Sequence, residues 1–186
     1  MSRVGLWESW YRNAKERVVY GDPLTAKRAG AFLNVSGIVT VEDWGCGLGG
    51  FRQYLGDHQT YIGVDGSRSP FVDVVCDLEH YRSSVDAIHL RHVLEHNHQW
   101  AMILENAVGS FQKRMVLTLF TPWAEETAVM ASYPDFLQTG QTMVDISFKR
   151  SDIVDRFSDV AHWIAEENMA TGCQYGVEHM FFLEKR

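Results

Sequence analysis

Several features that define whole classes of protein are scarce in this 186-residue chain. Its three cysteines are odd in number and lack C-x-x-C spacing, so free thiols in a reducing compartment fit Cys46, Cys76 and Cys173 best. No apolar run approaches the roughly 20 residues that span a bilayer, and the N-terminus lacks the pattern of a secretory signal. We therefore expect a cytoplasmic protein with no membrane span.

Basic residues are also few, with 17 Lys and Arg against 24 Asp and Glu and a formal net charge of -7. A broad nucleic-acid-binding surface needs clustered Lys and Arg that replace phosphate counterions, so the charge balance favours a small-molecule or glycan substrate. The chain has no internal repeat, low-complexity tract or linker, and 46% of its residues are apolar. These features predict a single domain over residues 1–186.

The most informative segment is a glycine-rich loop at residues 41–51, Val-Glu-Asp-Trp-Gly-Cys-Gly-Leu-Gly-Gly-Phe. Glycine tolerates positive φ and lets the backbone approach a ligand closely, and the N–H groups of a following helix attract charge. Gly45, Gly47 and Gly50 also satisfy the G-x-G-x-x-G of dinucleotide-binding enzymes, so a nicotinamide-dependent oxidoreductase stays open. Asp43, just before the first glycine of this loop, would attract a cationic amine and repel a pyrophosphate.

Short apolar runs alternate with helical patterns along the chain, which is typical of a parallel sheet. The expected strands cover residues 38–43, 59–65, 71–76, 85–90, 115–120, 160–166 and 177–183. The first three strands end at Asp43, Asp65 and Asp77. Helices are expected to begin at Asp22-Pro23, Asn97, Thr121-Pro122 and Ser151, with Asp22, Asn97 and Ser151 as N-caps. No helix separates the last two strands, which predicts an antiparallel hairpin.

Three motifs resemble those of the class I S-adenosylmethionine-dependent methyltransferases, in particular a small subgroup with D-x-G-C-G-x-G, G-x-D-x-S and H-V-L-E-H in this order. The chain supplies them as residues 43–49, 63–67 and 92–96. The resemblance covers the chain from about Pro23 to the C-terminus. It implies an α/β, Rossmann-like fold with a seven-stranded, mostly parallel sheet, a C-terminal antiparallel hairpin and helices on both faces.

The resemblance also implies which residues bind S-adenosylmethionine. The glycine loop, with Gly45 and Gly47, would pass under the methionine moiety, and Asp65 would accept hydrogen bonds from the ribose hydroxyls. Asp77 would bind the adenine amine. The complete set of expected cofactor-binding residues is Asp43, Gly45, Gly47, Asp65, Gly66, Asp77, Leu78 and Arg91, with Leu78 beside the adenine ring and Arg91 near the methionine part.

Possible bases crowd into ten residues after the fourth expected strand: His89, His92, Glu95, His96 and His98. Imidazole titrates near neutral pH, so a histidine that faces the pocket could accept a hydroxyl proton during methyl transfer. His96 is the first candidate base and His92 the second, with Glu95 completing the expected catalytic set. Each of these residues could instead hydrogen-bond backbone and shape the loop.

The spacing His92-x-x-Glu95-His96 leaves a divalent metal ion open as an alternative. It looks like the E-x-x-E-H element of metal-dependent O-methyltransferases, with His162 or His179 as further candidate ligands. His92 stands where that element has its first Glu, which softens the ligand set and weakens the case for Mg²⁺.

Two segments outside the motifs carry further expectations. Residues 1–22 are expected to form a helical extension, in which Trp7, Trp10 and Tyr11 could cover the mouth of the cofactor site. The same rings could instead pack on the outside of the sheet or mediate a homodimer. Residues 133–147, where the periodicity fades, are the expected acceptor-recognition insert.

The chain has no N-P-P-Y-like tetrapeptide after the fourth expected strand, which amine-methylating DNA and glutamine enzymes of this superfamily use. This favours a hydroxyl acceptor. The leading hypothesis is therefore an S-adenosylmethionine-dependent methyltransferase that O-methylates a small polar metabolite or glycan. The alternative is a non-catalytic cofactor-binding or scaffold module of the same fold.

Overall fold

A computed structural model describes residues 5–185 of the chain. Residues 1–4 of the expected N-terminal extension, and residue 186, lie outside the described residues. In chain order the helices and strands are α1 Glu8–Tyr11, α2 Leu24–Leu33, β1 Thr40–Trp44, η1 Gly50–Tyr54, β2 Thr60–Asp65, β3 Val74–Val75, β4 Val85–Arg91, η2 Leu94–His96, α3 Trp100–Ser110, β5 Phe111–Leu119, β6 Ala128–Tyr133, η3 Phe136–Gln138, β7 Met143–Ser147, α4 Arg150–Val154, β8 Ala161–Ala170 and β9 Val177–Lys185.

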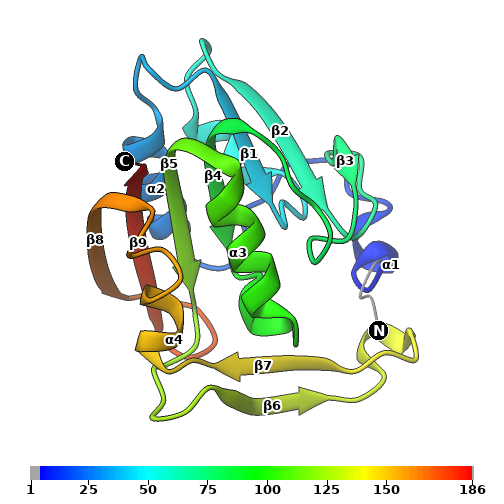
Figure 1. Ribbon diagram of the computed structural model, residues 1–186. Helices are drawn as coiled ribbons and strands as arrows, with labels where there is room; N and C mark the ends of the chain where they lie inside the picture. Colours follow the sequence, from blue (N-terminus) through cyan, green and yellow to red (C-terminus); the bar gives the residue numbers. More distant parts are fainter. Residues whose placement is uncertain (1–4, 186) are drawn as a thin grey trace.

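Seven strands form one sheet in the order β3-β2-β1-β4-β5-β9-β8 (Figure 1). The strands from β3 to β5 pair in parallel, whereas β9 is antiparallel to both β5 and β8. The predicted sheet with its C-terminal antiparallel hairpin is therefore confirmed. The chain builds outward from β1 to β3 and then returns to β4 beside β1. In an open α/β sheet, ligands bind beyond the carboxyl ends of the strands at such a reversal of strand order.

Helices cover both faces of the sheet and divide the core into two hydrophobic clusters. On one face, Leu104 of α3 and Ile153 of α4 pack against the strands. On the other face, Leu33 of α2 and Phe51 of η1 do the same. Successive strand residues point to opposite faces, so each strand supplies alternate side chains to each cluster.

The segment after β5 differs from the expectation. A helix was predicted from Thr121-Pro122, but β6 and β7 form a separate antiparallel two-stranded sheet that extends along one side of the molecule (Figure 1). Thr121 Oγ1 donates a hydrogen bond to the Ile146 carbonyl at 2.8 Å, so its side chain joins the hairpin instead of capping a helix. All residues of β7 are buried, and Val144 and Ile146 belong to the same cluster as α3. A strand buried on both faces gives no clear alternation, which explains the faded pattern at residues 133–147.

Three predicted helix caps are displaced. Asn97 lies before α3 and donates from Nδ2 to the Val93 carbonyl, so it stabilises the turn at η2 while Gln99 occupies the cap position. Ser151 lies inside α4, whose cap position is Lys149. Asp22 accepts a hydrogen bond from the Leu24 N–H, one residue before the observed cap position. The helices themselves exist at these places, although α4 is short.

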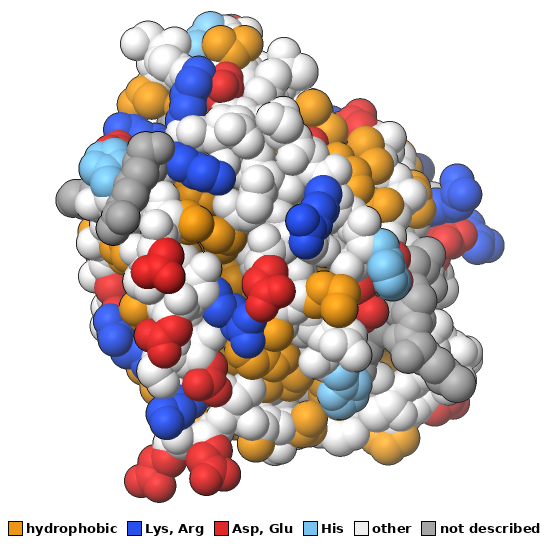
Figure 2. All heavy atoms as spheres, viewed as in Figure 1, with side chains coloured by type: hydrophobic (Ala, Val, Ile, Leu, Met, Phe, Trp, Pro, Cys, Tyr) orange, Lys and Arg blue, Asp and Glu red, His pale blue; other side chains and the backbone are white. Residues whose placement is uncertain are grey.

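The surface seen in Figure 2 mixes Lys and Arg with acidic and apolar side chains. Several Asp and Glu side chains gather toward the lower left of this view. Within residues 5–185, no helix combines the length and apolar character needed to cross a membrane.

Candidate functional site

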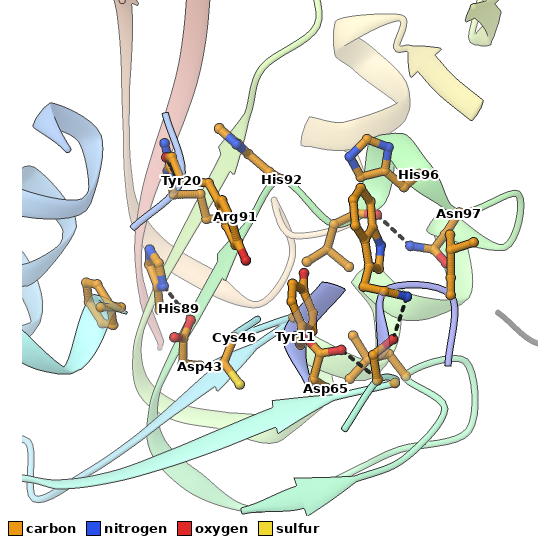
Figure 3. A pocket seen from close by; sticks show the side chains of 18 of the residues that line it. Tyr11, Tyr20, Asp43, Cys46, Asp65, His89, Arg91, His92, His96 and Asn97 are labelled. Carbon is orange, nitrogen blue, oxygen red and sulfur yellow. Dashed lines mark hydrogen bonds and ion pairs between the residues drawn. The ribbon is translucent and has the colours of Figure 1, made fainter. Parts of the chain in front are cut away.

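A cavity of about 340 Å³ opens at the carboxyl ends of β1, β2 and β4, where the strand order reverses. Figure 3 shows how side chains from these strands, from the loop after β4 and from the N-terminal segment face one another across it. Its lining includes seven of the eight expected cofactor-binding residues, namely Asp43, Gly45, Asp65, Gly66, Asp77, Leu78 and Arg91. Among the expected catalytic residues, His92 and His96 line the cavity.

The glycine loop requires glycine at two of the predicted positions. Gly45 has φ +73°, and a Cβ there would lie 2.2 Å from Val93 Cγ2. Gly47 has φ +53°, and a Cβ there would meet Tyr11 and Tyr20 at 3.1 Å. Gly47 is absent from the lining of the cavity because these two rings lie against it, but its N–H donates to Asp65 Oδ2 at 2.8 Å. The loop is therefore held to the end of β2.

Asp65 is buried at the end of β2 with its carboxylate held by backbone N–H groups. Ser67 donates to Oδ1 at 2.7 Å, and Gly47 donates to Oδ2. Burial raises the pKa of Asp65 to about 6, although these hydrogen bonds favour the ionised form. Each carboxylate oxygen can accept a further hydrogen bond, so Asp65 suits the two hydroxyls of a ribose. Gly66 beside it lines the cavity, and its carbonyl accepts from the Gly5 N–H.

Asp43 has a partner that the sequence analysis did not assign to it. Its Oδ1 lies 2.7 Å from His89 Nδ1, and its Oδ2 accepts a hydrogen bond from the Tyr61 hydroxyl at 2.8 Å. The His89 ring stacks on Phe51 at a centroid distance of 3.7 Å. His89 is opposite Asp43 in the β1–β4 pairing, which is why the two side chains meet. A partner on a neighbouring strand cannot be read from sequence spacing.

Asp77 and Leu78 lie where the third strand ends, although β3 is limited to two residues where six were expected. Asp77 Oδ1 accepts from the Glu79 N–H, and Leu78 is buried in the cluster that includes α3. Both residues line the cavity, so a planar ring could lie between them and the end of β2.

Arg91 ends β4 and takes part in a buried polar cluster that the sequence analysis missed. Its guanidinium donates to Glu178 Oε1 at 3.0 Å, to Thr25 Oγ1 and to the Tyr20 and Asp22 carbonyls. Glu178 on β9 is fully buried. An acid inside the apolar run of residues 177–183 was the signal that could have revealed it. Arg91 thus lines the cavity and also ties the start of α2 to the sheet.

His92 belongs to the same cluster, with Nε2 2.6 Å from Glu178 Oε1. Burial works against ionisation of Glu178, but His92 and Arg91 outweigh it and lower its pKa to about 2. Burial lowers the pKa of His92 to about 4, despite the opposing effect of Glu178. Because an ionised carboxylate only accepts hydrogen bonds, Nε2 must carry the hydrogen, and the neutral ring keeps its lone pair on Nδ1. No described residue hydrogen-bonds to that Nδ1.

The backbone at His92 has φ +57°, a left-handed conformation that is uncommon outside glycine. The His92 N–H donates to the Thr118 carbonyl at 3.0 Å, which anchors this turn to β5. Strained residues of this kind concentrate at functional sites, where the surrounding structure holds them in place. The conformation turns the chain from β4 into η2 and places the imidazole between Glu178 and the cavity.

The His96 imidazole contacts the β6–β7 hairpin, whereas His92 contacts Glu178. Its Nδ1 lies 3.0 Å from the Val144 carbonyl and 3.2 Å from Asp145 Oδ1. Burial alone would lower the pKa of His96, but hydrogen bonding to Asp145 and Val144 raises it above its usual value. Asp145 also accepts hydrogen bonds from the Tyr175 hydroxyl at 2.6 Å and the Tyr133 hydroxyl at 3.1 Å. The two candidate bases therefore have pKa values shifted in opposite directions.

Glu95 does not line the cavity. It is fully buried, and its Oε1 accepts a hydrogen bond from the Phe120 N–H at 2.6 Å. Burial raises its pKa to about 7. This geometry ties η2 to the end of β5, so the structure gives Glu95 a part in holding the loop and no contact with the cavity.

Solved structures with bound cofactor products share this arrangement of strands and helices. The N1-methyltransferase of 1,6-didemethyltoxoflavin from Burkholderia thailandensis, solved with S-adenosylhomocysteine, has a TM-score of 0.63 and 16% identity, covering 86% of this chain and 78% of that one. A magnesium protoporphyrin IX methyltransferase from Synechocystis, solved with S-adenosylhomocysteine, has a TM-score of 0.62 and 16% identity, covering 97% and 93%. The N-terminal domain of EvdMO1, solved in the presence of S-adenosylhomocysteine and D-fucose, has a TM-score of 0.62 and 13% identity, covering 91% and 85%.

This chain has the class I methyltransferase fold. No protein-family model matches its sequence, and no curated protein does either. The similarity therefore lies in the three-dimensional arrangement. The sequence identities are too low for the substrate of this chain to be inferred from those proteins.

The methyltransferase fold of this chain does not bring the proposed metal ligands together. His92 contacts Glu178, His96 contacts Asp145, and the Glu95 carboxylate accepts from the Phe120 N–H just after β5. His162 and His179 are elsewhere: His162 lies against the Lys185 carbonyl, and His179 lies against Asn168 and Trp123. Within residues 5–185, one group of three ligand atoms lies close enough for a metal ion, that of Asp77, Glu79 and His80.

The N-terminal segment lies over the cavity. Trp7, Trp10 and Tyr11 all line the cavity, and the Trp7 N–H donates to Ser67 Oγ at 3.0 Å. Arg17 donates to the Gly49 carbonyl at 3.1 Å. These rings therefore lie at the cavity, as in the covering arrangement considered from sequence, and their part in a homodimer stays a prediction.

Cys46 lies within the glycine loop and lines the cavity. Burial raises the pKa of its thiol well above the usual range, and the charges of Asp43 and Asp65 act in the same direction. Cys46 therefore stays a neutral thiol at physiological pH.

Proposed function

We propose that this protein is an S-adenosylmethionine-dependent methyltransferase that transfers the methyl group to a hydroxyl oxygen of a small polar metabolite or glycan. The observation that carries the proposal is one cavity, at the reversal of strand order, lined at once by Asp65, Asp77 and His92. Asp65 and Asp77 can accept hydrogen bonds from a nucleoside, and His92 can accept a proton. The methyltransferase fold supports the same conclusion.

The residues present fit the nucleoside part of such a cofactor. Asp65 has free lone pairs toward the cavity, and Asp77 and Leu78 border the same space. S-adenosylmethionine supplies an electrophilic methyl group on a sulfonium, which is a good leaving group. The protein then has to position the acceptor in line and remove one proton.

We place the base at His92, which reverses the order expected from sequence. Its neutral ring keeps a lone pair on Nδ1, whereas the Asp145 contact favours the protonated form of His96. When Nδ1 takes a hydroxyl proton, the imidazolium that forms lies 2.6 Å from the Glu178 carboxylate, which stabilises it. Environments that push two neighbouring pKa values apart are the usual sign of distinct acid and base roles.

A hydroxylated acceptor is supported by polar side chains next to His96. Tyr133 and Asp145 of the β6–β7 hairpin form a hydrogen-bonded group with Gln174 and Tyr175 of the β8–β9 connection. The presence of D-fucose in the EvdMO1 structure supports a sugar, whereas the toxoflavin enzyme acts on nitrogen. The segment at residues 133–147 remains our proposed acceptor-recognition insert.

Two measurements test the proposal. Isothermal titration calorimetry should show binding of S-adenosylmethionine and S-adenosylhomocysteine to the purified chain, and absence of both would refute it. Incubation with methyl-labelled S-adenosylmethionine and fractionated cell extract should then label an acceptor. If His92→Gln binds the cofactor as the wild type does and neither protein labels an acceptor, the chain is a non-catalytic binding module.

A further inference from the structure

Four aromatic rings of the N-terminal segment form one continuous wall of the cavity. The aromatic wall consists of Trp7, Trp10, Tyr11 and Tyr20, all of which line the cavity. Trp7 and Tyr11 stack with centroids 6.2 Å apart at an interplanar angle of 12°, and Tyr11 and Tyr20 stack at 6.2 Å and 27°. The wall precedes α2 and contributes no strand to the sheet.

The wall spans the distance between the glycine loop and the loop after β4. At one end, Tyr11 and Tyr20 lie so close to Gly47 that a Cβ there would be 3.1 Å from each. At the other end, the Trp7 ring lies 5.9 Å from the His96 ring. Figure 3 shows Tyr11 between Asp65 and the histidines of the loop after β4. The aromatic wall therefore extends from the glycine loop to His96 in the loop after β4.

The charge of the cavity favours a cation at this place. Among the described residues that line it, Arg91 is the sole Lys or Arg, and its guanidinium is paired with the buried Glu178. Asp65, by contrast, has its carboxylate held by backbone N–H groups. A cation in the cavity would meet a carboxylate and the faces of aromatic rings, both of which attract positive charge.

We propose that the aromatic wall recognises the sulfonium charge of S-adenosylmethionine and so makes the protein bind the methyl donor more tightly than its neutral product, S-adenosylhomocysteine. This rests on the proposed function. The two molecules differ by the methyl group and its positive charge, and aromatic faces interact with that charge. The residues that cover the site thereby distinguish substrate from product and favour product release after transfer.

Calorimetry with three ligands tests this inference. The wild-type chain should bind S-adenosylmethionine about tenfold more tightly than S-adenosylhomocysteine. Sinefungin, which carries an ammonium in place of the methylsulfonium, should bind like S-adenosylmethionine. The double substitution Tyr11→Leu and Tyr20→Leu should bring the ratio close to one, chiefly through weaker binding of the two cations. The matched double substitution to Phe keeps both rings and should keep the preference.

Each outcome of these titrations either supports or overturns the role given to the aromatic wall. Equal wild-type affinities for the three ligands, or a preference that survives in the Leu double variant, would overturn the inference while leaving the proposed function intact. Absence of binding by all three would overturn both. Because Tyr11 is buried, thermal unfolding followed by circular dichroism checks the fold of each variant. If the Leu double variant does not fold, the partly exposed Trp7→Leu provides the comparison, with the same loss of preference expected.

Discussion

The two sides of the cavity use buried carboxylates in opposite ways. On the side of β2, Asp65 is held by backbone N–H groups, and burial raises its pKa to about 6. On the side of β9, Glu178 is surrounded by Arg91, Thr25 and His92, which lower its pKa to about 2. An acid without a cationic partner is poised to meet a ligand, whereas a compensated acid holds other side chains in place. The comparison thus separates Asp65, which is poised to meet a ligand, from Glu178, which holds Arg91 and His92 in place.

The largest effect should come from the imidazole that Glu178 orients. His92→Gln removes the base, so turnover should fall by about 10²–10⁴-fold, measured as S-adenosylhomocysteine released with the labelled acceptor. Cofactor affinity should be retained. The exposed His98 in the same loop provides the control, since His98→Gln should leave turnover unchanged.

The pH dependence of turnover sharpens this assignment. His92 must be unprotonated to act, and its pKa is about 4, so kcat should stay level as pH falls from 8 to about 5 and decline below that. His96, with its raised pKa, would instead give a decline that begins above pH 6.5. A decline in that higher range, or a larger loss in His96→Gln than in His92→Gln, would assign the base to His96.

Removal of Glu178 should chiefly affect stability. Glu178→Ala leaves the Arg91 guanidinium buried without its carboxylate, which should lower the free energy of unfolding by about 3–5 kcal/mol in urea denaturation. Glu167→Ala on β8 is the control, because its ion pair with Arg28 is exposed and should contribute about 1 kcal/mol or less. Equal effects of the two substitutions would contradict the role given to Glu178.

On the opposite side, Asp65→Ala should weaken cofactor binding by about 1–3 kcal/mol, through loss of charge-assisted hydrogen bonds to the ribose. Calorimetry measures the change. Asp73→Ala is the matched control, since Asp73 accepts a backbone hydrogen bond from Gly63 but does not line the cavity. Wild-type affinity should also fall as pH drops through about 6, where Asp65 becomes protonated. Unchanged affinity in Asp65→Ala would remove this assignment.

The smallest effect concerns Glu95, which belongs to neither side of the cavity. Its folded pKa of about 7 lies above the ordinary 4.5, so the fold loses stability as pH rises from 4.5 to about 7, and the loss is complete above that range. Glu95→Gln keeps the acceptor for the Phe120 N–H and removes the buried charge. The variant should be more stable than the wild type by about 1 kcal/mol at pH 8.5, with a smaller difference at pH 5.5. Denaturation curves at the two pH values measure this, and a less stable variant at pH 8.5 would contradict it.

The glycine-loop side of the cavity could be predicted from the sequence because its signals are local. Glycines with positive φ, strand ends and acids adjoin one another in the chain, so Gly45, Gly47 and Asp65 needed no knowledge of packing. The partners of His89 and His92 could not be found in this way. Asp43 and Glu178 reach them across the sheet, and only the strand order decides which strands are neighbours.

The β6–β7 hairpin shows a second limit. Thr121-Pro122 is a good helix start in isolation, but β7 is buried on both faces and gives no alternating pattern to contradict it. Tertiary packing of Val144 and Ile146 then decides the structure. The same hairpin supplies Asp145, which changes the protonation of His96 and with it the order of the candidate bases.

The neutral state of the Cys46 thiol affects how readily this sulfur could be alkylated. A thiolate is a strong nucleophile, and a thiolate in the wall of a cavity proposed to bind a methyl donor would be open to alkylation by that donor. Asp43 and Asp65, acting together with burial, suppress that ionised form. Asp43 and Asp65, which border the proposed cofactor cavity, thus also keep this sulfur from reacting with the methyl donor proposed to bind there.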